Sequence, residues 1–245
     1  MTVFQWVTDI IGATGVSSAF LVAFAYLPWM MGRATRQSYI AMARAVEARE
    51  PHLIGHAEQT ARYVVAMAWL SLRFSPRQIR SLESAALLHT IGKVGVPFDI
   101  LNRPTPPSTT SDRFALRDYV RISAAIIGAV PGHADSAEMV RFHREYMDGS
   151  GYPHGRYGHS IPLGARLLCV ATEFVALTSP RVYRGGLPAL SPDNACTYLW
   201  AYSGERYDRH AVRLLVFCYR AKKLFSLLRP RSRPRAAQMH AAVTE

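Results

Sequence analysis

Three histidines on separate predicted helices, His56, His89 and His143, are the residues best suited to chemistry in this chain. An imidazole can ligate a divalent metal ion or move a proton near neutral pH, so three imidazoles that converge would form a metal or acid–base centre. A single histidine is more often packed in the core or exposed to solvent. The three residues therefore define a site only if the surrounding helices bring them together.

A loop with an unusual composition follows the third histidine closely. Residues 148–158, "DGSGYPHGRYG", contain four glycines, two tyrosines and one proline. These are too many helix breakers for a helix, although helix-like apolar sequence lies on both sides. We expect a loop whose backbone shape serves a function.

The elements that must position these residues are helices. Apolar residues recur every three to four positions, and no pair of alternating strands with a hairpin turn is present. With 245 residues, of which 49% are hydrophobic, the chain can bury a packed core. We therefore predict an all-α bundle. The expected helices cover about 34–49, 54–72, 77–90, 113–128, 135–146, 162–178, 190–202 and 207–227.

The N-terminal segment is strongly apolar. No charged side chain occurs from Ile10 to Gly32, and this run of 23 residues is long enough to span a bilayer. Arg33 and Arg36 follow it, which by the positive-inside rule would leave the rest of the chain in the cytoplasm. A buried, interfacial or dimer-forming helix is the alternative.

The opposite end of the chain is basic. The formal net charge is +12, and no acidic residue occurs between Asp208 and Glu245. Residues 219–245 are expected to form a disordered tail, which is either a solvated end without a partner or a contact for anionic lipid or nucleic acid. Nucleic acid is the least supported of these, because no helix-turn-helix or other DNA-binding module is readable.

Four separated segments resemble, in order and approximate spacing, the HD-GYP family of the HD phosphohydrolase superfamily. The resemblance covers about residues 48–215 and implies a helical, metal-dependent phosphodiesterase that hydrolyses cyclic di-GMP. It also implies two or three metal ions, usually iron or manganese, that activate a water and neutralise phosphoryl charge. The segments are "GHAEQTARYV" at 55–64, "AALLHTIGKVGVPFDILNRP" at 85–104, "FHREYMDGSGYPHG" at 142–155 and "ARLLCVATEFVALTSPRVYR" at 165–184.

The glycine-rich loop resembles the signature turn of that family. Gly151, Tyr152 and Pro153 match its Gly-Tyr-Pro triplet, and Asp148 and Gly149 precede them. The resemblance implies that this loop lies beside the substrate pocket. It also implies a docking surface for diguanylate cyclases and adaptor proteins.

At the family's metal positions the chain keeps three imidazoles and loses the other ligands. His56, His89 and His143 match family histidines. A threonine hydroxyl is a poor ligand for a divalent ion, and an arginine repels one. The replaced positions are Thr90, Tyr119 (or Asp118, if the alignment has no gap), Arg144 and Thr172.

Other side chains are candidate helpers for a reduced metal site. His52 lies four residues before His56 on the same helical face, and Asp118 and Glu145 are further candidates. A mononuclear centre of His52, His56, His89 and His143 is one interpretation, and packed or solvated histidines are the other.

This chain keeps basic residues that the family has near its site, whereas it has replaced several of the family's metal ligands. Lys93 matches the family lysine near the site and is the candidate catalytic residue as well as a ligand contact. Arg181 and Arg184 match residues that face the phosphates of the ligand. Guanidinium and ammonium groups bind phosphate without a metal. Arg144 could supply the charge that a metal would otherwise provide, and Tyr152 is a further ligand contact.

These matches predict a degenerate HD-GYP domain in cyclic di-GMP signalling, which is a catalytically impaired ligand-binding or protein-interaction module. The alternative is an active metal-dependent phosphodiesterase with a reduced iron or manganese site, so enzymatic activity stays open. The expected location is the inner membrane with a cytoplasmic domain, or the cytoplasm. The expected parts are an apolar segment over 1–33, a linker helix over 34–50, the HD-GYP-like domain over 51–218 and the tail over 219–245.

Overall fold

The computed structural model describes residue 20 and residues 22–50, 53–103, 109–180 and 188–228, and in these ranges the chain is helical with no β-strand. The all-α prediction is confirmed. The longer helices are α2 (Leu27–Glu47), α3 (His56–Ser71), α4 (Pro76–Leu88), α6 (Thr110–Gly128), α7 (Ala134–Phe142), α8 (Leu163–Leu177), α9 (Pro192–Ala201) and α10 (Arg209–Leu228). The shorter ones are η1 (Val22–Tyr26), η3 (Ile91–Gly95), α5 (Phe98–Leu101) and η4 (Gly158–Ser160).

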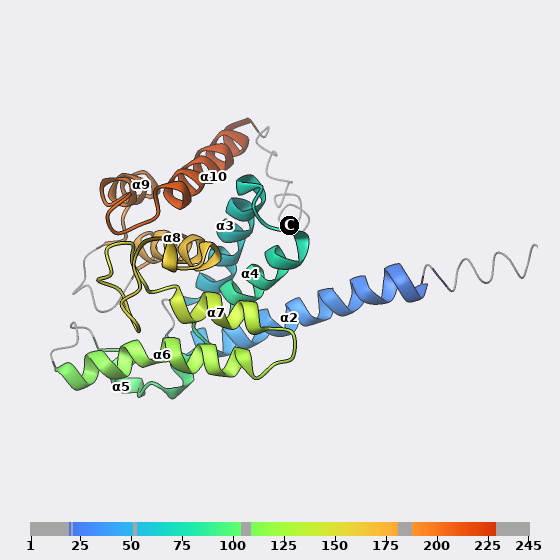
Figure 1. Ribbon diagram of the computed structural model, residues 1–245, viewed down its shortest axis with the longest axis horizontal. Helices are drawn as coiled ribbons and strands as arrows, with labels where there is room; N and C mark the ends of the chain where they lie inside the picture. Colours follow the sequence, from blue (N-terminus) through green and yellow to red (C-terminus); the bar gives the residue numbers. More distant parts are fainter. Residues whose placement is uncertain (1–19, 21, 51–52, 104–108, 181–187, 229–245) are drawn as a thin grey trace, which may run out of the picture.

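The core lies between α3, α4, α7, α8 and α10. Figure 1 shows α8 behind the loop that follows α7, with α6 and α5 along one side of the body and α9 and α10 along the other. Fully buried apolar side chains from each of these five helices form one continuous cluster, which is the main source of stability in a bundle of this kind. Its members include Val64, Met67, Leu82, Leu87, Val140, Leu168, Val170, Val212 and Leu215.

Local sequence signals fix where several helices begin. Ser75 and Gln78 form a reciprocal capping box at the start of α4, with Pro76 as the next residue. The Thr109 hydroxyl accepts from the Asp112 amide at the start of α6. The Ser191 hydroxyl accepts from the Asn194 amide at the start of α9. These caps satisfy backbone amides that have no partner within the helix.

The first long helix begins earlier than expected, before residue 34. α2 begins at Leu27 and directly continues η1, so one helical stretch crosses the change from apolar to basic sequence. Figure 1 shows the N-terminal part of α2 projecting away from the body. Only its C-terminal part packs on the body, through Ile40, Ala43 and Val46. A helix can propagate through a change in side-chain polarity, because its hydrogen bonds are made by the backbone.

The predicted membrane span is not supported. None of the helices in the described ranges is both long enough and apolar enough to cross a bilayer. Residues 10–19 and 21, which belong to the predicted span, lie outside the described residues.

The C-terminal helix extends beyond the expected end of the domain. α10 matches the helix expected over about 207–227, and it includes residues 219–228, which were also assigned to the basic tail. The apolar three-to-four periodicity of this segment favours such a helix. Residues 229–245, which hold the rest of the basic tail, lie outside the described part of the chain.

Candidate functional site

The structure brings the three imidazoles together. His56 is the first residue of α3, His89 follows the last residue of α4, and His143 follows the last residue of α7. The ring centroids of His56 and His89 are 5.3 Å apart, and those of His89 and His143 are 5.5 Å apart. All three side chains are buried. Helix ends from three parts of the sequence thus form one buried imidazole cluster.

Backbone carbonyls orient two of the rings. His89 Nδ1 lies 2.7 Å from the Ala86 carbonyl oxygen, and His143 Nδ1 lies 2.6 Å from the Val140 carbonyl oxygen. A carbonyl oxygen only accepts, so Nδ1 donates in both cases. In the neutral ring Nε2 then carries the lone pair and is the nitrogen available to a ligand or a hydrogen-bond donor.

Tyr119 contacts His143 at that nitrogen, and Arg144 contacts Tyr119. The Tyr119 hydroxyl, on α6, lies 3.2 Å from His143 Nε2, and Arg144 Nε donates to the same hydroxyl oxygen at 2.9 Å. Because Nε2 accepts, the hydroxyl must donate to it. Arg144 Nη1 also lies 3.5 Å from a carboxylate oxygen of Glu173 on α8. A chain of hydrogen bonds thus runs from the Val140 carbonyl through His143 and Tyr119 to the guanidinium.

The electrostatics keep His143 neutral and Arg144 charged. Burial lowers the pKa of His143 well below its ordinary value, and the neighbouring Arg144 and His89 lower it further. Burial also disfavours the charge of Arg144, but nearby tyrosine oxygens and Glu173 outweigh it, so the pKa of Arg144 lies well above its ordinary value. The positive charge at this centre therefore belongs to the guanidinium.

Two threonines, at positions where the resemblance implies metal ligands, are buried. Thr90 and Thr172 are 4% and 0% exposed. Among the described residues the Thr172 hydroxyl oxygen has no hydrogen-bond partner. Nowhere in the described ranges does a group of three or more His, Cys, Asp or Glu side chains have the arrangement that a metal ion requires.

The carboxylates considered as helpers have other partners. Asp118 lies on the surface of α6 and pairs with Arg121, with 2.7 Å between Oδ1 and Nε. Glu145 is buried and accepts from the backbone amides of His154 and Arg156, at 2.7 and 3.0 Å. His52 lies outside the described residues.

Glu145 holds the glycine-rich loop in place. Its two carboxylate oxygens fix the loop from inside, and the Tyr152 amide donates to the Arg144 carbonyl at 3.0 Å. A Cβ at Gly151 would lie 2.4 Å from the Cα of Glu145 and 2.5 Å from the Arg144 carbonyl oxygen, so only glycine fits. The loop is thus bound to the chain segment that carries His143 and Arg144.

The other loop residues complete this turn. Asp148 Oδ1 accepts from the amide and the hydroxyl of Ser150, at 2.9 and 2.7 Å. Gly149 has a φ of +80°, which favours glycine, and the peptide bond between Tyr152 and Pro153 is cis. The Tyr152 ring packs against the buried cluster that includes Tyr119, and burial raises the pKa of its hydroxyl.

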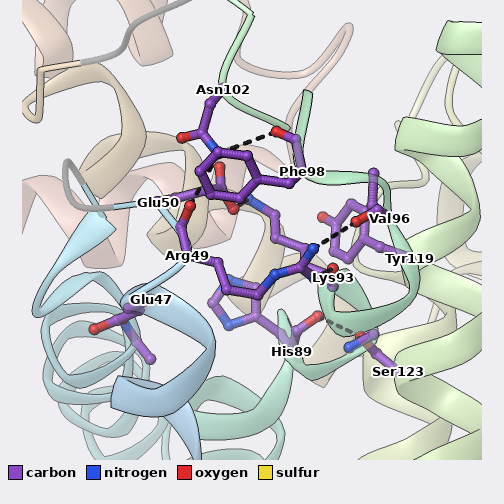
Figure 2. A network of polar contacts seen from close by, with 12 residues as sticks. Glu47, Arg49, Glu50, His89, Lys93, Val96, Phe98, Asn102, Tyr119 and Ser123 are labelled. Carbon is purple, nitrogen blue, oxygen red and sulfur yellow. Dashed lines mark hydrogen bonds and ion pairs between the residues drawn. The ribbon is translucent and has the colours of Figure 1, made fainter. Parts of the chain in front are cut away.

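Lys93 forms a partly buried ion pair next to the imidazole cluster. Its Nζ lies 2.7 Å from a Glu50 carboxylate oxygen and 5.8 Å from the centroid of the Tyr119 ring. Figure 2 shows Lys93 close to both Glu50 and Tyr119. The Arg49 guanidinium donates to the carbonyls of Lys93 and Val96, at 2.6 and 2.9 Å, which fixes this segment.

Ser123 on α6 ties the same segment to the end of α4. Its hydroxyl accepts from the Gly92 amide at 2.8 Å and donates to the His89 carbonyl at 3.0 Å (Figure 2). A Cβ at Gly92 would lie 2.2 Å from the Tyr119 carbonyl oxygen, so η3 packs closely against α6. This close approach places Lys93 and Tyr119 side by side.

Some site residues were not found from the sequence. Glu50 and Glu173, the partners of Lys93 and Arg144, were both missed. Glu173 could have been found from the sequence, because it is the only acidic residue in the apolar sequence of α8 and a buried carboxylate needs a partner. Arg181 and Arg184, expected to contact phosphate, lie outside the described residues.

The sequence model of the HD domain family matches residues 41–211, so the chain belongs to the HD domain family. A solved structure of a cyclic GMP-AMP-specific phosphodiesterase from Vibrio cholerae has a TM-score of 0.58. It is 18% identical, and the match covers 80% of this chain and 51% of that one. At this identity the likeness shows the fold.

Curated relatives confirm the resemblance to the HD-GYP family. The chain is 32% identical over 183 residues to the cyclic di-GMP phosphodiesterase response regulator RpfG of Xanthomonas campestris, over 74% of this chain and 47% of that protein. It is 34% identical over 148 residues to 3′3′-cGAMP-specific phosphodiesterase 3 of Vibrio cholerae, over 60% of this chain and 32% of that protein. The chain spans less than half the length of both relatives.

Proposed function

We propose that this chain is a degenerate HD-GYP domain of cyclic di-GMP signalling, which binds a cyclic dinucleotide or a partner protein and hydrolyses the nucleotide poorly or not at all. The observation that carries the proposal is the guanidinium of Arg144, hydrogen-bonded through Tyr119 to an imidazole of the buried cluster. A fixed cation there opposes the binding of divalent ions.

The side chains available as metal ligands support the same conclusion. His56, His89 and His143 offer imidazole nitrogens, whereas buried threonines occupy positions 90 and 172, where bridging carboxylates would be expected. Neutral hydroxyls do not offset the charge of two or three divalent ions. The residues present therefore do not fit a bridged iron or manganese cluster, and we assign no reaction step to a metal.

Basic and aromatic side chains remain for an anionic ligand. Arg144, Lys93 and Tyr152 lie around the loop and the imidazole cluster, and we propose that Arg181 and Arg184 join them at the phosphates. Arg144 and Lys93 each have a carboxylate partner, so a phosphate would compete with Glu173 and Glu50 for the same cations.

A calorimetric titration with cyclic di-GMP and with 3′3′-cGAMP, followed by chromatography of the same samples, tests the proposal. We expect binding without linear product. Arg144→Gln should weaken binding about 10- to 100-fold, since a hydrogen bond to a charged group contributes about 1.5–3 kcal/mol. The exposed Arg141 of the preceding helix provides the matched control, Arg141→Gln. If neither nucleotide binds, the receptor function is wrong. If linear product accumulates, the catalytic impairment is wrong.

An active phosphodiesterase with a reduced metal site is the second candidate, and the convergence of three imidazoles favours it. It predicts turnover that depends on added iron or manganese and is abolished by His89→Ala. The same chromatography distinguishes the candidates, because only this one yields linear product from the wild-type chain.

The glycine-rich loop is also a candidate protein contact. Pro153, His154 and Tyr157 are exposed on a loop whose backbone is fixed from inside by Glu145. We propose this surface as the contact for a diguanylate cyclase or an adaptor protein. Tyr157→Ala should then weaken capture of such a partner without affecting nucleotide binding.

Contact with a lipid surface is proposed from the N-terminal helical stretch. Phe24, Trp29 and Met31 are 69%, 58% and 65% exposed, and basic residues follow at Arg33 and Arg36. Sedimentation with vesicles that contain anionic lipid tests this. Phe24→Ser with Trp29→Ser should abolish sedimentation if these side chains make the contact.

A further inference from the structure

The imidazole cluster already contains a hydrogen-bond donor and a cation supplied by the chain. His143 Nδ1 donates to a carbonyl, so its Nε2 carries the lone pair, and the Tyr119 hydroxyl lies 3.2 Å from it. Arg144 Nε donates to that hydroxyl at 2.9 Å. The hydroxyl proton occupies this lone pair and the guanidinium supplies a positive charge, which are the two roles that a bound metal ion would otherwise fill.

We infer that Tyr119 and Arg144 together replace a metal ion at this centre, so that the cluster is held together, and its positive charge maintained, without any metal. Tyr119 supplies the contact to His143. Arg144 supplies the charge, and Glu173 and Tyr119 position its guanidinium. Tyr119 is therefore a positioning residue for the cluster.

Competition with a metal ion follows from this geometry. A metal at His143 Nε2 would have to displace the Tyr119 hydroxyl from the lone pair that it occupies. It would also lie next to the Arg144 guanidinium, which the Tyr119 hydroxyl and Glu173 hold in place. Removing Tyr119 from this position would in turn leave Arg144 Nε without its phenolic acceptor. Metal entry is thus opposed both by sterics and by charge.

The consequence for ligand binding rests on the proposed function. If a cyclic dinucleotide binds here, its phosphodiester meets a guanidinium rather than a metal ion. Its affinity should then be the same with and without a chelator.

Thermal denaturation of the full-length protein, purified anaerobically and treated with EDTA, tests the inference. The melting temperature is measured with no metal and with an excess of Mn²⁺, Fe²⁺ or Zn²⁺, and retained metal is determined by mass spectrometry. We expect no metal-dependent change in the wild type. Tyr119→His with Arg144→His places two imidazoles where the replacement residues were. Metal should raise the melting temperature of this double variant by about 5–10 °C.

Arg141→His is the matched control, because it adds an imidazole at an exposed position of α7, outside the buried cluster. It should show no metal-dependent change. A metal-dependent rise in the melting temperature of the wild type, together with near-stoichiometric retained metal, would overturn the inference. The wild-type measurement decides this even if the double variant does not fold.

Nucleotide titrations keep the two proposals separate. Tight binding that requires Mn²⁺ or Fe²⁺ would contradict the metal replacement but preserve nucleotide binding. Absence of binding under all conditions would contradict the proposed function. The melting temperatures would then still decide whether Tyr119 and Arg144 replace a metal.

Discussion

Tyr119→Phe removes one oxygen atom from the centre of the hydrogen-bond chain and is the sharpest perturbation of the site. Tyr119 is 5% exposed, so solvent cannot take over its contacts. The substitution leaves His143 Nε2 and Arg144 Nε without the hydroxyl that now lies 3.2 and 2.9 Å away. The ring and its packing are retained.

The expected loss of stability follows from these two contacts. A neutral hydrogen bond contributes about 1 kcal/mol, and one to a charged group about 1.5–3 kcal/mol. Phenylalanine offsets a small part of this loss, because it has no hydroxyl to desolvate. The free energy of unfolding should therefore fall by about 2–3 kcal/mol. In a chain of this size that lowers the melting temperature by about 4–12 °C.

Urea denaturation followed by circular dichroism measures the change, with the slope of the transition expected to stay constant. Tyr157→Phe is the matched control, because Tyr157 is 72% exposed, and it should change the free energy of unfolding by less than about 0.5 kcal/mol. If Tyr119→Phe were as stable as this control, the hydrogen-bond chain would not hold the cluster. Histidine ¹⁵N spectra give a second readout, since His143 should be protonated at Nδ1 and not at Nε2.

Three further substitutions probe the elements around the site. Gly151→Ala should lower the free energy of unfolding by about 2–3 kcal/mol, because its Cβ would meet backbone atoms, whereas Gly128→Ala, with its nearest contact at 3.5 Å, should not. Ser123→Ala, which loses contacts to two backbone groups, should cost about 1–3 kcal/mol in urea denaturation. Burial opposes the charge of Asp208, but hydrogen bonds from a backbone amide and from Arg166 keep its pKa below the ordinary value. A carboxyl whose pKa is lowered by folding stabilises the protein above its unfolded pKa, and this is lost as the pH falls through the folded pKa. Urea midpoints from neutral to acidic pH should therefore decline less steeply for Asp208→Asn than for the wild type.

Each of these expectations has a contrary outcome. Equal stability of Gly151→Ala and Gly128→Ala would mean that the loop can move away from the segment below it. If Ser123→Ala had the same free energy of unfolding as the wild type, this hydroxyl would not hold η3 against the end of α4. Parallel pH profiles for the wild type and Asp208→Asn would remove Asp208 as a source of acid sensitivity.

The helices could be predicted from the sequence because apolar periodicity and breakers determine them locally. The capping box of Ser75 and Gln78 and the proline that follows it are further local signals. The start of α2 was placed too late, because the change in polarity near Arg33 was taken as a boundary. Pro28, in the first turn of α2, was the better signal.

The site was predictable in its residue types and not in its contacts. The resemblance implied a shared site for His56, His89 and His143, with packed or solvated histidines as the alternative. The role of Arg144 depends on the direction of its side chain at the end of α7 and on Tyr119 from another helix, which no local pattern specifies. The same holds for Glu145. It was considered as a metal ligand, but in the structure it accepts hydrogen bonds from two amides of the glycine-rich loop.

Metal content and cyclic di-GMP turnover, measured on one anaerobically purified sample of the full-length protein supplied with iron and manganese, test the central claim most directly. The account predicts that no metal is retained and that the nucleotide is recovered intact. Near-stoichiometric iron or manganese together with linear dinucleotide or GMP would contradict it.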